Sequence, residues 1–173
     1  MRINFKIYLG ILVLAFSTTC STETLDSLKN RLSHTDNTDE MWQVAEEIKS
    51  KGKDGIPVFL SVLSSIKKSD KSVVLEYGRI NVCLSSLYDL AKEGKFIIDE
   101  VPILIETFDK QLHISDTLIT AEILRIITGV DPDYSDEFVK QYEGTKEDEE
   151  VIQAKIAEWR NWYSVHPTKS KSL

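Results

Sequence analysis

Two apolar stretches of the chain follow the same pattern, Ile-Pro-Val-Phe-Leu at residues 56–60 and Val-Pro-Ile-Leu-Ile at residues 101–105. In each stretch and the turn after it, apolar residues recur at the i, i+3, i+4 and i+7 spacing of one helix face. Proline at the second position fits the first turn of a helix, where its missing N–H has no intrahelical acceptor. The stretches lie 45 residues apart, so we expect one structural position to be used twice. The residues of the two faces are Ile56, Phe59, Leu60 and Leu63, and Val101, Leu104, Ile105 and Phe108.

The segments around these stretches also predict helices. Glycine is the usual residue just after a helix, because it adopts the left-handed conformation without steric cost, and Gly52, Gly94 and Gly129 each follow an apolar face. Thr38 and Thr145 are predicted helix starts. Strand-like alternation is hard to find, so the sequence predicts an all-α fold. The three faces are Met41, Trp42, Ala45 and Ile48; Tyr77, Ile80, Leu84, Leu87 and Ala91; and Ile119, Ile123, Ile126 and Ile127.

Pairs of helices that repeat every 40–47 residues or so are typical of HEAT and armadillo repeats. The passages from glycine through a short loop to apolar-Pro-apolar, at residues 52–60 and 94–105, are similar to the joins inside HEAT repeats. Residues 121–131 and 159–163 resemble the closing segment of many such proteins. The chain thus resembles bacterial HEAT-like repeat proteins, which implies a short α-solenoid of antiparallel helix pairs. Leu118-Ile119 stand where many repeats have Val-Arg, which leaves the number of repeats open.

The last predicted helix carries two of the three tryptophans. A solenoid needs an end that covers the apolar face of its last repeat. We therefore expect these aromatic side chains to pack in the core rather than to stack on a ligand. The face consists of Ile152, Ile156, Trp159 and Tyr163, with Trp162 beside it.

The first nineteen residues have the layout of an export signal. A short basic start leads into an apolar segment at residues 7–16, then into Ser17-Thr18-Thr19 and Cys20. The apolar segment has half of the roughly 20 residues that a spanning helix needs, so we expect it to be removed. A cysteine at the cut resembles the acylated first residue of a bacterial lipoprotein. This resemblance implies that Cys20 is the lipid attachment site, with a diacylglyceryl group on its sulfur and an acyl chain such as palmitate on its amino group.

Ordinary secretion stays open as an alternative. Ser17 stands where lipoprotein signals usually carry an aliphatic residue, and Ala15-Phe16-Ser17 fits the small-x-small cleavage rule. The mature chain would then start at Thr18 and be soluble, and Cys20 and Cys83 could pair as a disulfide in an oxidising compartment. If Cys20 is acylated, the apolar helical surroundings of Cys83 predict a buried, inert thiol.

The predicted segments are a signal peptide at 1–19, a tether with a first short helix at 20–37, an α-helical repeat domain at 38–167 and a disordered tail at 168–173. Removal of the signal leaves 154 residues, the size of one domain, and changes the net charge from −7 to −9. This acidity argues against a nucleic-acid partner. It also argues against electrostatic adsorption to anionic lipid, which leaves acyl chains on Cys20 as the membrane tether.

The histidines His34, His113 and His166 share no spacing with each other or with cysteine that would indicate a zinc site. A calcium loop starting at Asp131 fails at two demanding positions, because position six is Asp136 instead of glycine and position twelve is Tyr142 instead of glutamate. A turn between two helices explains this segment better. The acidic run at 147–150 fits the start of a helix, whose dipole favours negative charge.

These observations predict a non-enzymatic protein of the bacterial cell envelope, on its periplasmic or surface side, that binds another protein. The second helix of each pair is expected to form most of the binding surface. No metal, cofactor or small-molecule substrate is expected. An immunity-type lipoprotein that neutralises an envelope-acting toxin is the alternative, and an enzyme of unknown type comes third.

Overall fold

The computed structural model describes residues 23–66, 73–96, 98–108, 114–130 and 145–166. All regular elements in these ranges are helical, which confirms the predicted all-α class. The short 3-10 helices are η1 (Gly52–Gly55) and η2 (Ile98–Glu100). The α-helices are α1 (Leu25–His34), α2 (Thr38–Lys49), α3 (Ile56–Ser65), α4 (Val73–Lys92), α5 (Val101–Thr107), α6 (Ile114–Thr128) and α8 (Lys146–Val165).

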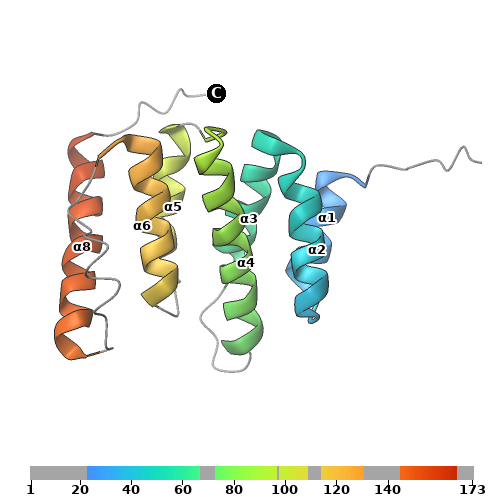
Figure 1. The fold of residues 1–173 in the computed structure, drawn as a ribbon, viewed down its shortest axis with the longest axis horizontal. Coiled ribbons are helices and arrows are strands. Elements are labelled where there is room, and N and C mark those ends of the chain that lie inside the picture. Colours follow the sequence, from blue (N-terminus) through green and yellow to red (C-terminus); the bar gives the residue numbers. More distant parts are fainter. Residues whose placement is uncertain (1–22, 67–72, 97, 109–113, 131–144, 167–173) are drawn as a thin grey trace, which may run out of the picture.

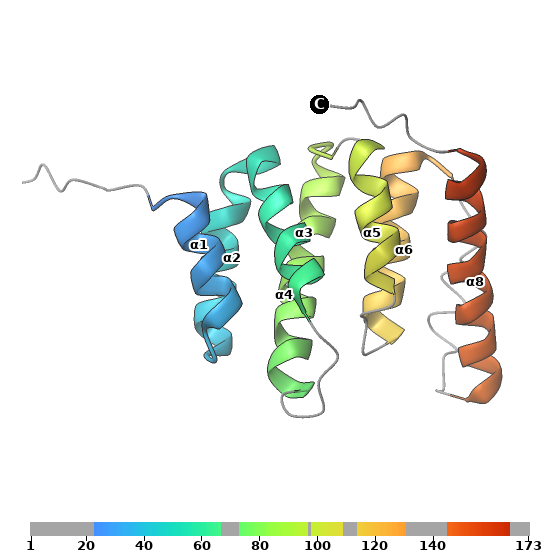
Figure 2. The same cartoon turned by 180° about the vertical axis from the view of Figure 1, so that it is seen from behind.

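The helices form two layers (Figures 1 and 2). The first-helix layer consists of α1, α3 and α5, and the second-helix layer consists of α2, α4 and α6. Neighbours pack within each layer, and α1 packs on α2, α3 on α4 and α5 on α6 across the layers. Helices of one layer run opposite to those of the other, and α8 stands at one end, packed against α5.

The two matching stretches of sequence begin α3 and α5. Pro57 and Pro102 lie in the first turn of these helices, each directly after a 3-10 turn. All eight apolar residues predicted for the two faces are buried. Because α3 and α5 are neighbours in one layer, the repeat in the sequence corresponds to successive positions of the first-helix layer.

The predicted glycine stops are confirmed. Gly52, Gly94 and Gly129 have φ angles of 61°, 68° and 67°, in the left-handed region that glycine adopts without penalty. After α4, the N–H of Gly94 donates to the Ala91 carbonyl at 2.9 Å and the N–H of Lys95 to the Leu90 carbonyl at 3.0 Å. These bonds satisfy carbonyls that the helix end leaves open.

The helix starts agree with the sequence to within one residue. Thr38 is the first residue of α2, but the capping side chain belongs to Asn37. Its Oδ1 accepts hydrogen bonds from the N–H groups of Asp39, at 2.9 Å, and Glu40, at 3.2 Å. Asparagine is a preferred residue at this position because it satisfies N–H groups that have no partner in the helix. The last helix, α8, begins directly after Thr145.

One cluster of buried apolar side chains runs through all seven described α-helices. It includes Leu28 and Leu32 of α1, which packs on α2 and α3. At the other end, Trp159 of α8 is only 1 % exposed and meets Trp162 edge-on, with ring centroids 5.8 Å apart. Tyr163 is half-buried. The aromatic side chains of α8 therefore pack in and beside the core.

The prediction for Trp42 was wrong. Met41 and Val44 are fully buried, whereas the Trp42 side chain is 38 % exposed. Successive residues of an α-helix are about 100° apart around the axis, so the residue after a core position can face solvent. Tyr77 is also only half-buried, as are Ile119, Ile126 and Ile127, three of the four residues predicted for the face of α6. The buried side of α6 instead carries Thr117, Thr120, Ala121 and Leu124.

Candidate functional site

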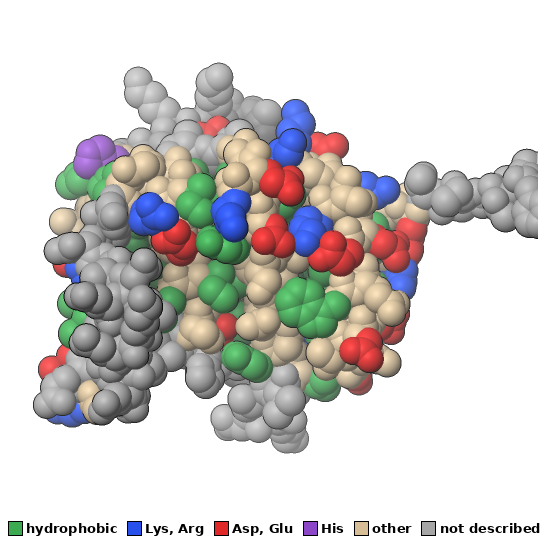
Figure 3. All heavy atoms as spheres, viewed as in Figure 1, with side chains coloured by type: hydrophobic (Ala, Val, Ile, Leu, Met, Phe, Trp, Pro, Cys, Tyr) green, Lys and Arg blue, Asp and Glu red, His purple; other side chains and the backbone are tan. Residues whose placement is uncertain are grey.

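The outer face of the second-helix layer divides into two zones. Figure 3 shows Lys, Arg, Asp and Glu side chains gathered in a row along its upper edge, over the ends of the helices. Below this row the face carries few charged side chains and several hydrophobic ones.

In the charged row, Lys49 links α2 to α4. Its ammonium donates to Glu46 at 2.7 Å and to Asp89 at 3.0 Å. These two carboxylates, Glu46 first, raise the pKa of Lys49, so the lysine stays charged. Lys49 is the last residue of α2, where a cation also interacts favourably with the helix dipole.

Two further cations, near the ends of α4 and α6, have partners as well. On α4, the Lys92 ammonium lies 5.1 Å from the centre of the Tyr88 ring, a cation–π contact. On α6, the Arg125 guanidinium donates two hydrogen bonds to the Glu122 carboxylate. Lys49 and Arg125 are therefore each compensated by a carboxylate within the chain.

Trp42 is the large hydrophobic side chain that α2 exposes. This residue lies seven positions before Lys49, so both fall on the side of α2 that faces α4. The neighbouring Met41 sulfur lies 3.6 Å from where a Cβ on Gly78 of α4 would be. Because Met41 and Trp42 are adjacent in sequence, we group Trp42 with Gly78, Asn81 and Ser85, half-buried residues at the i, i+3 and i+7 positions along one side of α4. We call these four residues the Trp42 band.

The band combines an exposed indole with a strip of small, uncharged residues. Arg79, from the turn of α4 that contains Gly78, fixes this part of the helix. It donates to the Thr35 carbonyl at 2.9 Å and to Asp36 at 3.3 Å, in the connection between α1 and α2. Side-chain contacts therefore join α4 to α2 at one end of the band, through Lys49, and to the connection before α2 at the other end, through Arg79.

Of the two cysteines, Cys83 lies among the described residues. Cys20, the predicted lipid attachment site, lies outside the described residues. Cys83 is fully buried in α4 and forms no disulfide with a described residue. Burial raises the pKa of its thiol far above the ordinary value, because a thiolate is poorly stabilised in apolar surroundings.

The histidines lie in separate places. His34 ends α1, with its Nδ1 2.8 Å from the Asn30 carbonyl oxygen, and His166 stacks on Trp162 after α8. His113 lies outside the described residues, as does the candidate calcium segment at 131–142. Of the acidic run, Glu150 pairs with Lys146 in the first turns of α8. No group of three or more His, Cys, Asp or Glu side chains among the described residues could hold a metal ion.

No protein-family model, curated protein or solved structure matches this chain. Within the described part, none of the helices has the length and apolar character needed to cross a bilayer. Function must therefore be inferred from the surface chemistry of the chain.

Sequence reasoning missed the Trp42 band because it assigned the tryptophan to the core. Met41, Val44, Ala45 and Ile48 already complete a buried face at the i, i+3, i+4 and i+7 spacing. An additional large apolar residue beside a complete face is a signal that could have marked Trp42 as a surface residue.

Proposed function

We propose that this chain is an exported, lipid-anchored α-solenoid protein that binds another protein of the cell envelope through the Trp42 band. The stacking order supports the solenoid. The pairs α1–α2, α3–α4 and α5–α6 follow one another in space as in sequence, and each packs on the next. Such stacking creates extended surfaces suited to protein binding.

The exposure of Trp42 carries the binding proposal. Tryptophan is enriched among the few residues that dominate the energy of protein interfaces, and this one is 38 % exposed beside the uncharged residues Gly78, Asn81 and Ser85 of α4. One turn after Trp42, Glu46 pairs with Lys49, which also pairs with Asp89, so a partner that covers this group does not bury each of these charges alone. An apolar centre with a polar rim is the usual anatomy of an interface.

We also propose that the role of this surface is non-enzymatic. An exposed indole beside glycine, asparagine and serine suits recognition of a complementary surface, whereas a catalytic site needs groups positioned for proton transfer or nucleophilic attack. We therefore propose recognition of a protein as the activity of this surface.

The membrane tether is proposed from the order of the segments. Four residues separate Cys20 from Leu25, the first residue of α1. Two or more acyl chains on Cys20 would anchor the protein stably, because each buried methylene contributes about 0.8 kcal/mol. The α1 end of the helical stack would then lie near the membrane surface.

Site-specific photo-crosslinking tests the binding surface. A crosslinking amino acid replaces exposed Gln43, beside Trp42, and in a matched control it replaces exposed Ala157 on α8. We expect a discrete crosslinked product from position 43 in native cells and none from position 157. Trp42→Ala should reduce the yield at least tenfold, while Val165→Ala, at another exposed apolar residue, should not. An unchanged yield in a folded Trp42→Ala variant would overturn the proposal.

Fatty-acid labelling and membrane fractionation test the tether. Wild type should incorporate label and sediment with membranes, and Cys20→Ala should do neither. Cys83→Ala, which removes the other cysteine, should behave as wild type. If Cys20→Ala kept both label and membrane association, the lipid anchor would be wrong, while the crosslinking result at Trp42 would stand by itself.

A further inference from the structure

A polar network binds the first described residue of the chain to the helical stack. The Glu23 carboxylate accepts hydrogen bonds from the Ser27 hydroxyl at 2.6 Å and from the Arg31 guanidinium at 2.5 Å. Beside it, the Thr24 side chain caps α1 by accepting from the Ser27 N–H at 3.3 Å. Both residues that directly precede α1 are therefore bound to that helix.

Arg31 carries this network from α1 to α2. Its guanidinium also donates to Glu40, in the first turn of α2, at 3.4 Å, and the other oxygen of Glu40 accepts from the Thr35 hydroxyl at 2.7 Å. Each of the two acids thus has a hydroxyl and a guanidinium as partners, a firmer arrangement than an isolated exposed ion pair. We call Glu23, Arg31 and Glu40 the Arg31 clamp.

The surroundings of the clamp support it in two ways. The pKa of Glu23 is lowered, first by the hydrogen bond from Ser27, and the pKa of Glu40 is lowered, first by the hydrogen bond from Thr35. Both acids are therefore ionised at neutral pH. The Thr35 carbonyl in turn accepts from Arg79 of α4 at 2.9 Å, so the network reaches the middle of the stack.

The clamp is close in sequence to the proposed lipid site and close in space to the Trp42 band. Two residues separate Cys20 from Glu23, and three Cα-to-Cα steps span at most about 11 Å. The ten residues of α1 are about 15 Å long, and α2 packs beside α1 at an interaxial distance of about 10 Å. Trp42, in the second turn of α2, therefore lies within about 30 Å of Cys20.

We infer that the Arg31 clamp holds the anchored start of the mature chain on α1, so that the Trp42 band stays near the bilayer and binds a protein that is itself embedded in or anchored to the same membrane. This inference rests on the proposed lipid anchor. A long flexible linker would let the solenoid move far from the membrane, since its reach grows as about 5–6 Å times the square root of its length. Here the first bound side chain, Glu23, comes three positions after Cys20.

The heteronuclear NOE of backbone amides tests the clamp without the lipid, in the mature chain carrying Cys20→Ala. We expect the NOE of Glu23 to be close to that of α1, and Arg31→Gln to lower it to less than half. Arg125→Gln, which breaks a similar arginine–glutamate pair on α6, should leave it unchanged. A folded Arg31→Gln variant with an unchanged NOE at Glu23 would overturn the clamp.

Fluorescence quenching tests the distance to the bilayer in the acylated protein. A fluorescent amino acid replaces exposed Asn30 on α1 and, in a matched control, exposed Ala154 on α8 at the other end of the stack. In vesicles with a nitroxide on the lipid headgroups, we expect at least threefold stronger quenching at position 30. Ten Gly and Ser residues inserted between Thr22 and Glu23 add about 17 Å of reach and should reduce this difference at least twofold.

The outcomes of this measurement separate the inference from the lipid anchor. Equal quenching at the two positions of a fatty-acid-labelled protein would overturn the inference alone. Absence of fatty-acid label would refute the anchor and the inference together, whereas the NOE of Glu23 reports on the clamp in either case.

The crosslinked product from position 43 tests the class of partner. Mass spectrometry of this product should identify a protein that sediments with membranes even in cells that lack the present chain. A partner that is soluble in those cells would overturn the inference and would leave the Trp42 band as a binding surface.

Discussion

Two tryptophans of this chain have opposite environments. Trp159 is 1 % exposed and closes the core at the α8 end, whereas Trp42 is 38 % exposed on α2. Both follow apolar helical patterns in the sequence, so the residue type does not distinguish them. What distinguishes them is the position around the helix axis relative to the neighbouring helices.

This difference predicts unequal costs of truncation. Trp159→Ala should lower the free energy of unfolding by about 3–5 kcal/mol, because it leaves a large cavity in the core. Trp42→Ala should change it by no more than about 0.5 kcal/mol, as for an ordinary surface residue. Urea unfolding followed by far-UV circular dichroism measures both values. Equal losses would mean that Trp42 supports the fold rather than a binding surface.

Cys83 provides a second test at the scale of the residue. Its burial raises the pKa of the thiol, and the neutral thiol reacts slowly with alkylating reagents. In a Cys20→Ala background, iodoacetamide at about pH 8.5, where an exposed thiol is half ionised, should leave the native protein unmodified and should label the denatured protein rapidly. Fast labelling of the native state would show that α4 opens readily.

At the scale of the element, glycine has two distinct roles. Gly94 lies just after α4 with a φ of 68°, and a Cβ there would meet no atom within 4 Å. Gly55 lies at the start of α3 with an ordinary φ of −78°, but a Cβ there would lie 2.5 Å from the Ile48 carbonyl oxygen. The first glycine is needed for its backbone conformation and the second for close packing of η1 and α3 on α2.

Alanine substitution should separate these roles. Gly94→Ala should cost about 1 kcal/mol, the penalty of a side chain in the left-handed conformation. Gly55→Ala should cost about 2–3 kcal/mol, because backbone must move to relieve the clash. The midpoints of urea unfolding measure the two costs. A smaller loss for Gly55→Ala than for Gly94→Ala would show that the contact between η1 and α2 relaxes easily.

At the scale of the whole molecule, the helices differ in how many neighbours support them. In the middle of the stack, α4 packs on α2, α3 and α6, whereas α1 at one end packs on α2 and α3, and α8 at the other packs on α5. In a stacked array, stability arises mainly from contacts between neighbours. The ends are therefore expected to open more readily than the centre.

Amide hydrogen exchange measures this gradient directly. Amides of α4 should exchange most slowly and report global unfolding, while those of α1 and α8 should exchange faster through local opening. Uniform protection across α1, α4 and α8 would contradict this expectation and would indicate that the described helices unfold as a single cooperative unit.

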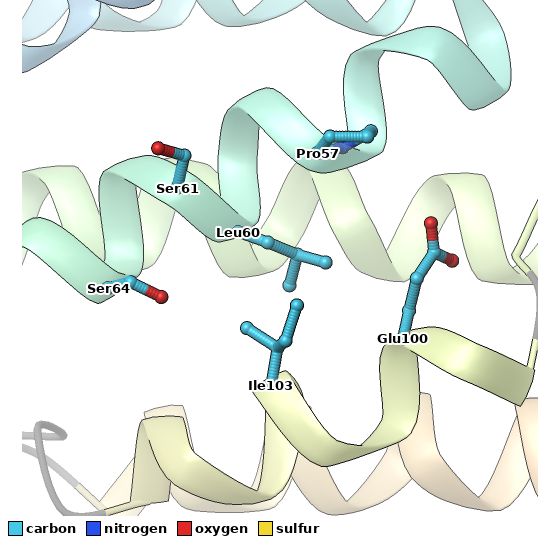
Figure 4. Close-up of a pocket in the computed structure, with 6 residues that line it drawn as sticks. All are labelled: Pro57, Leu60, Ser61, Ser64, Glu100 and Ile103. Atoms are coloured by element: carbon cyan, nitrogen blue, oxygen red, sulfur yellow. The ribbon is translucent and has the colours of Figure 1, made fainter. Parts of the chain in front are cut away.

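The helices, the proline-marked starts of α3 and α5 and the glycine stops at Gly52, Gly94 and Gly129 are readable from the amino-acid pattern alone. These features depend on periodicity and capping within one or two turns, which neighbouring residues encode. The exposure of Trp42 and the groove that Leu60 and Ile103 share with Glu100 (Figure 4) come from the packing of the helices. These features depend on which helices pack side by side and on their rotation about their axes, and the contacts that fix both join residues far apart in the chain.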